Sequence, residues 1–240
     1  MLAWAWSRRR GYSVSRVPPT VFLSARPQDV LWLQNLDEKA PIAADLREGC
    51  SFNKWRAAGA VVAGDWDQQV LPVESFPVYR PFRQHFIDKV DWLQIEGLEI
   101  EKKRAERKAK RNFRMTSCEG AHQERFAALD KMFSDFQANE YYPQSKITGR
   151  IFDELAVNVG RHGQLIRNSS AGHRLVVAQL SGLHTIPARV VVRHSEWEAL
   201  RNKVVAHVLE SGSSSLPKEL ESYRNHPDVV AAINSKAHVR

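Results

Sequence analysis

AGHRLVVAQLSGLHTIPARVVVRH, the stretch from Ala171 to His194, decides the fold class of this chain. It begins with a tight turn, and the pattern that follows predicts a short helix over Leu175 to Leu183. After a second turn, Ile186 to Arg193 is rich in β-branched residues and predicts a strand. A helix that alternates with strands is typical of an α/β protein.

Further strands are expected upstream of this stretch. Ile151 to Asn158 and Gln164 to Arg167 are mostly apolar and flank the turn GRHG, Gly160 to Gly163, which indicates a strand–turn–strand unit. TVFLSARPQD, within Val17 to Asp29, predicts one more strand that is closed by a proline turn. We therefore expect a small mixed sheet built around residues 150–193.

The residues between 78 and 138 have the period of helices instead. Large apolar side chains recur every three or four residues, so each helix should bury one face. The second of these helices is expected from about Glu119 to Asn139. The residues that form the two stripes are Tyr79, Phe82, Phe86 and Val90, then Phe126, Leu129, Phe133 and Phe136.

No linker is long enough to separate two domains firmly, so the expected organisation is one domain. Residues 1–16 are predicted to be a basic, disordered start, and residues 17–240 a single α/β domain. Within that domain we expect an amphipathic helical insertion over 78–140, a core over 145–194 and a helical tail over 195–240.

Composition excludes some classes of protein. The chain has 240 residues, no uninterrupted apolar run near eighteen residues, and only two cysteines. A transmembrane span, a thiolate metal site and a disulfide-stapled secreted fold are therefore not expected, and a cytoplasmic location is the default. No histidine pattern for zinc is present, so we predict no metal site of that kind.

The formal net charge of +8 is concentrated in one place. Residues 101–114, EKKRAERKAKRNFR, hold many more basic than acidic side chains. Such a stretch can attract a nucleic-acid backbone. It can also be the solvated end of a long helix, and the sequence leaves both interpretations open.

The turn before the predicted helix carries the strongest candidate site. Gly172 allows close backbone approach, and His173 and Arg174 add basic groups where the helix amides and dipole already favour an anion. The alternative is local satisfaction, with His173 under the hairpin and Arg174 against Asp153 or Glu154.

GDWD, Gly64 to Asp67, is the second candidate site. Asp65 and Asp67 could share Mg²⁺ with a phosphate, because Mg²⁺ prefers oxygen ligands. Either carboxylate could act instead as a general base toward a substrate hydroxyl. In a third interpretation the turn is structural, and Trp66 is its buried anchor.

The segment GRHGQLIRNSSAGHRLVVAQLSGLHTIPARVVVRHSEW, Gly160 to Trp197, resembles the ParB/sulfiredoxin-like superfamily. It is most similar to uncharacterised prokaryotic proteins described as ParB-like nuclease-domain proteins, which also tend to carry GDWD ahead of an aromatic helix. The resemblance runs from about residue 60 to 230. It implies a ParB/sulfiredoxin-like small mixed sheet with flanking helices.

The resemblance also implies a ligand at the turn. Related branches hold the phosphates of ATP, ADP or CTP there, so Gly172, His173 and Arg174 are the expected contacts of a nucleoside triphosphate, ATP or CTP, with Mg²⁺. Sulfiredoxin chemistry needs a cysteine where this chain has Gly172, so that activity is rejected. No helix-turn-helix follows the motif, which argues against chromosome partition.

Two functions follow as expectations. The first is a protein that binds a nucleotide or another phosphorylated small molecule, as a phosphotransferase or nucleotide hydrolase with Asp65 or Asp67 as the catalytic carboxylate. The second is a nucleic-acid-binding or regulatory ParB-like module that uses residues 101–114. Salt dependence of binding would separate them.

Overall fold

The computed structural model describes residues 12–18, 20–39, 42–111, 118–211 and 216–237. Contacts divide the chain into two compact units. The sheet unit comprises the described residues of Met1–Pro72, Pro143–Ala171 and Thr185–Arg240, and the helical unit comprises those of Val73–Tyr142 and Gly172–His184. The described chain is mixed α/β, as the sequence predicts.

The sheet unit holds every strand of the described chain. In order these are β1 (Phe22–Ala25), β2 (Trp32–Gln34), β3 (Arg47–Glu48), β4 (Ser51–Phe52), β5 (Ala60–Val62), β6 (Val70–Pro72), β7 (Leu155–Val159), β8 (Leu165–Arg167) and β9 (Ile186–His194). Its helices are α5 (Gln144–Thr148), α7 (Ser195–Ser211), α8 (Lys218–Glu221) and α9 (Pro227–Ala237).

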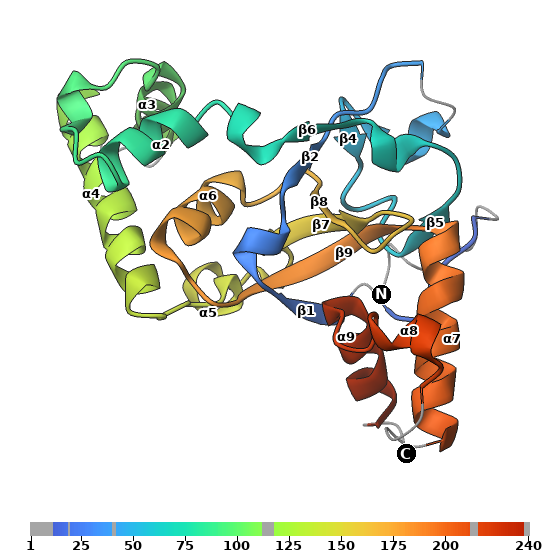
Figure 1. Ribbon diagram of the computed structural model, residues 1–240. Coiled ribbons are helices and arrows are strands. Elements are labelled where there is room, and N and C mark those ends of the chain that lie inside the picture. The colour runs from blue at the N-terminus through green and yellow to red at the C-terminus, as the bar shows by residue number, and fades with distance from the viewer. Residues whose placement is uncertain (1–11, 19, 40–41, 112–117, 212–215, 238–240) are drawn as a thin grey trace. The chain divides into compact units, whose positions relative to one another are not determined.

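One mixed sheet has the order β1-β9-β7-β8-β2-β6, with β5 also paired to β9. β9 is parallel to β5 and β7 and antiparallel to β1, and Figure 1 shows it passing through this sheet. Val190, Val191 and Val192 of β9 are all buried, and because successive side chains point to opposite faces, β9 is covered on both faces there. β3 and β4 form a separate two-stranded sheet.

The predicted strand positions agree closely with the observed ones. The GRHG turn connects β7 to β8, and the strand expected over Ile186 to Arg193 is β9. Ile151 to Asp153 forms a single 3₁₀ turn rather than the start of β7. Of the start expected to be disordered, residues 1–11 lie outside the described part, while Val14 makes an antiparallel bridge to Ala60.

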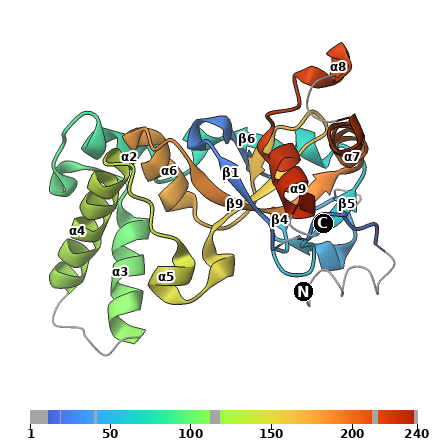
Figure 2. The same ribbon diagram turned by 90° about the horizontal axis from the view of Figure 1, so that it is seen from below.

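The helical unit contains α2 (Tyr79–Phe86), α3 (Glu99–Arg111), α4 (Cys118–Gln137) and α6 (Gly172–Ser181). Figure 2 shows α3 and α4 side by side, and α2 and α4 both pack against α6. The helix Leu175–Leu183 expected from sequence is therefore real, but it begins at Gly172 and packs with the other helices.

Aromatic stacking forms the core of the helical unit. Six of the eight residues of the two predicted stripes are buried, whereas Tyr79 and Val90 are only half-buried. The Phe86 and Phe133 rings stack with centroids 4.3 Å apart, and Trp92 stacks on Phe126 at 4.9 Å. Phe82 is fully buried against Phe86 and Trp92. α2 ends at Phe86, so Val90 lies beyond the helix that its spacing suggested.

Candidate functional site

The turn that opens α6 has an unusual backbone. Ala171 has φ of 58°, in the left-handed region that non-glycine residues seldom adopt. The next residue, Gly172, is buried and begins the helix. The first amides of any α-helix lack carbonyl partners inside the helix and carry the positive end of its dipole. The local geometry is therefore suited to an anion.

His173 contacts a carboxylate from α3. Its Nε2 lies 2.5 Å from Oε1 of Glu101, whose side chain is only 1% exposed. Burial lowers the pKa of His173 below its ordinary value, although Glu101 works against that shift. At neutral pH the ring is therefore neutral, and Nε2–H donates to the carboxylate.

Two arginines share that carboxylate. Arg125 of α4 donates from Nε and Nη2 to Oε2 of Glu101, at 3.0 and 2.7 Å. Arg104 of α3 lies 2.9 Å from Nδ1 of His173 and 3.7 Å from Oε1 of Glu101. Burial alone would raise the pKa of Glu101, but His173 and Arg125 outweigh it and lower the pKa to about 2.

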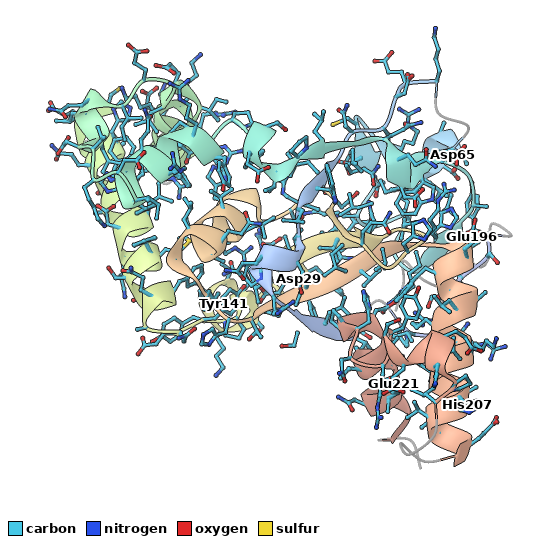
Figure 3. All side chains as sticks on the ribbon, in the orientation of Figure 1. Asp29, Asp65, Tyr141, Glu196, His207 and Glu221 are labelled. Carbon is cyan, nitrogen blue, oxygen red and sulfur yellow. The ribbon has the colours of Figure 1, made fainter. Side chains whose placement is uncertain are left out.

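Arg174 and two aromatic rings complete the surroundings of the turn. Arg174 donates from Nη1 to the hydroxyl of Tyr141, which follows α4 and is labelled in Figure 3. The rings of Phe76 and Phe82 lie 6.0 and 5.7 Å from the His173 ring. All these side chains belong to the helical unit. We define Glu101, Arg104, Arg125, His173 and Arg174 as the α6 cluster.

The GDWD turn belongs to the sheet unit and is a second, separate site. Trp66 is 2% exposed, and its indole N–H donates to the carbonyl of Val62. Asp67 is buried and accepts hydrogen bonds from the backbone N–H, Nε and Nη2 of Arg161. Burial on its own would raise the pKa of Asp67, but Arg161 outweighs it and lowers that pKa.

Asp65 binds the same guanidinium as Asp67. Its Oδ1 lies 2.7 Å from Nη2 of Arg161, although 74% of its side chain is exposed. Asp65 is labelled in Figure 3. Nη2 also donates to the carbonyl of Gly64. Arg161 of the GRHG turn thus donates hydrogen bonds to three groups of the GDWD turn: the Gly64 carbonyl and the carboxylates of Asp65 and Asp67. These contacts favour the structural interpretation of GDWD.

Arg193 and His194, at the end of β9, also make their side-chain contacts within the sheet unit. Arg193 is 1% exposed and binds both oxygens of Asp228, from α9. His194 Nε2 lies 2.9 Å from the carbonyl oxygen of Gly64. Both residues therefore connect elements of the sheet unit.

Sequence reasoning identified the α6 turn but not its partners. Glu101 and Arg104 lie inside the stretch 101–114, which suggested a solvated face or a nucleic-acid contact. Glu101 is the one acidic residue of that stretch that is fully buried, in the part of it that the structure describes. Its position in the sequence could have indicated this burial. Glu101 comes three residues after Leu98 and four before Ala105, so it lies on the same helix face as these two buried apolar residues.

Within the described ranges, no group of three or more His, Cys, Asp or Glu side chains could hold a metal ion. Every described helix is too short or too polar to cross a bilayer. The chain matches no protein-family model, and comparison with curated proteins and with solved structures finds no match either.

Proposed function

We propose that this protein binds the phosphate group of a nucleotide, or of another phosphorylated small molecule, at the turn that opens α6. One observation carries the proposal: two arginines, Arg104 and Arg125, surround a single carboxylate beside a neutral His173. Two arginines against one carboxylate leave a net positive charge beside the start of α6. Helix amides and Arg174 add donors of the kind that bind phosphate.

The strained residue before the helix supports the same proposal. A left-handed alanine costs roughly 1–2 kcal/mol, and such outliers cluster where backbone must be positioned for a ligand. A ParB/sulfiredoxin-like fold, with this turn as its phosphate-binding element, remains part of the proposal. ATP and CTP, with Mg²⁺ carried on the phosphates, are the first ligands to test.

Binding is better supported than catalysis by the described contacts. Asp67 is buried and accepts hydrogen bonds from Arg161 with both oxygens, so Arg161 would have to leave before Asp67 could bind Mg²⁺ or accept a substrate proton. Asp65 is bound to the same guanidinium through Oδ1. We therefore propose a binding function and do not assign a reaction.

A thermal-shift and calorimetric screen of ATP, ADP, CTP and GTP with Mg²⁺ tests the proposal. Bound ligand should raise the melting temperature of the parent protein. Arg174→Ala and Arg104→Gln should lose most of that gain. Arg107→Gln is the matched control, because Arg107 is exposed on the same helix and its Nε donates to a carbonyl of that helix. The absence of any shift at millimolar nucleotide would refute the proposal.

A nucleic-acid function is the second candidate, and one observation favours it. Lys103, Arg107 and Lys110 are exposed at helical spacing along α3, so they form one basic row. Affinity for duplex or single-stranded DNA should then fall steeply with salt, and the triple substitution by Gln should remove it. The substitutions expected to remove nucleotide binding, at Arg174 and Arg104, differ from the triple substitution expected to remove nucleic-acid binding, so the two functions can be told apart.

A further inference from the structure

Arg189 of β9 is a buried cation without a counter-charge. The residue is 1% exposed, and its Nη1 donates to the carbonyl of Lys54 at 3.0 Å. Its Nε and Nη2 are buried and have no hydrogen-bond partner. No described carboxylate binds it, and the residues outside the described ranges include no Asp or Glu. Burial without compensation lowers the pKa of Arg189 to about 10.

Two aromatic rings enclose this guanidinium. Its carbon atom lies 5.7 Å from the Trp55 centroid and 5.4 Å from the Phe152 centroid, and the two rings meet edge to face. Cation–π attraction compensates a buried guanidinium only in part, because it supplies no hydrogen-bond acceptor to the N–H groups. Trp55 itself is 46% exposed.

The two unpaired nitrogens have a specific arrangement. Nε–H and one Nη2–H of an arginine are parallel donors, spaced to match the two oxygens of a carboxylate or of a phosphate group. A second cation is nearby: Lys54 lies on the same loop as Trp55, and its Nζ is 3.4 Å from the hydroxyl of Ser170. The hydrogen-bond donors near one another here are thus the Nε–H and Nη2–H of Arg189, the ammonium of Lys54 and the hydroxyl of Ser170.

We propose that Arg189, Lys54 and Ser170 form a binding site for a small oxyanion, two of whose oxygens accept from Nε and Nη2 of Arg189. The anion supplies the negative charge that the surrounding protein lacks. The site lies wholly in the sheet unit, so the proposal does not rest on the nucleotide function assigned to α6.

Calorimetry with inorganic phosphate, with acetate and with sodium chloride at equal ionic strength tests the site on the full chain. We expect saturable binding of an oxyanion and none of chloride. Phosphate binding alone would identify a phosphoryl ligand, and acetate binding alone a carboxylate ligand. Trp55 fluorescence, obtained by comparison with Trp55→Phe, should change over the same concentration range.

Variants separate this site from other cationic surfaces. Arg189→Lys keeps the charge but loses the fork and should weaken binding by roughly tenfold or more. Lys54→Gln should also weaken it, whereas Arg56→Gln, an exposed arginine of the same loop, should not. Arg174→Ala should leave this binding unchanged, which distinguishes it from the α6 cluster.

Stability provides a second readout. Without ligand, Arg189→Met should melt at or above the temperature of the parent, because it removes an uncompensated buried charge. If Arg189→Met is strongly destabilised and the parent binds neither oxyanion, the arginine serves only to pack against the rings and the proposal is wrong. Equal binding by the parent and Arg189→Lys would also overturn it.

Discussion

Glu101 and His173 come from two different helices and are joined by a hydrogen bond of 2.5 Å between Oε1 and Nε2. The carboxylate is the common partner of His173 and Arg125, and it is almost fully enclosed. Because α3, α4 and α6 each contribute one of these three side chains, the three helices are joined by polar contacts beside an aromatic core. The charge state of this one carboxylate therefore governs the start of α6.

Glu101→Gln should lower the free energy of unfolding by about 3–5 kcal/mol, as for other buried pairs from which one charge is removed. The substitution leaves Arg125 without its anion. Denaturant unfolding followed by circular dichroism measures the change, and Glu99→Gln, exposed in the same helix, is the control. A loss no larger than that of the control would contradict the structural role of Glu101.

Buried histidines should make the protein less stable in mild acid. Burial lowers the pKa of His173 and of His226 below 6.5, so the unfolded chain takes up protons that the folded chain refuses. Stability should therefore fall as the pH drops below 6.5, by at most about 1.4 kcal/mol per pH unit for each histidine. His173→Gln and His226→Gln should each flatten this slope. The measurement is unfolding free energy at a series of pH values.

Glu101 acts in a lower range of pH. Its pKa falls from an ordinary 4.5 to about 2, so its stabilising effect is complete above pH 4.5 and is lost as the pH approaches 2. Glu101→Gln should be less sensitive to acid than the parent between these values. An identical acid transition in both proteins would show that Glu101 is not held as an ion.

Asp67→Asn should destabilise the sheet unit by about 3 kcal/mol, because it breaks the buried pair with Arg161. Asp65→Asn should cost less than about 1 kcal/mol, since that side chain is mostly exposed. Melting curves of the two single variants test this order. If Asp67→Asn instead leaves stability intact while nucleotide binding is lost, the carboxylate has a ligand-binding role.

Gly163→Ala should be far more damaging than Gly149→Ala. Both glycines have left-handed φ values, of 86° and 70°, so both variants carry a similar backbone cost. A Cβ at Gly163 would also lie 2.7 Å from the Trp197 ring, whereas at Gly149 it would meet nothing within 4 Å. We expect a difference of about 1–3 kcal/mol between the two, measured by denaturant unfolding. Equal losses would mean that the Trp197 ring moves aside freely.

Local sequence patterns predict those parts of the fold that depend on neighbours in the chain. The three- and four-residue spacing of Phe126, Leu129 and Phe133 predicts a buried helix face, and the β-branched run predicts β9. The sequence does not show that β5 and β1 both pair with β9. Those pairings join segments that are far apart along the chain, and periodicity carries no information on partners.

The candidate sites, too, are predicted from the sequence only where they depend on residues close together in the chain. Glycine, histidine and arginine at the start of a helix are visible from sequence, and so are the paired carboxylates of GDWD. The partners that decide their chemistry, Glu101 for His173 and Arg161 for Asp67, are distant in sequence. The sequence does not indicate a site at Arg189. The lack of a counter-charge depends on the residues that surround Arg189 in space, and these are not its neighbours in the chain.

The central position of β9 has a consequence for synthesis on the ribosome. β1, β5 and β7 all hydrogen-bond to β9, which is the last strand of the described chain to be made. At roughly 5–20 residues per second, the interval between translation of Phe22 and of Arg189 is on the order of 8–30 s. Throughout that interval β1 lacks its partner, and the backbone N–H and C=O groups along its edge stay unpaired. The nascent chain therefore exposes strand edges that can pair with other chains until β9 has been made.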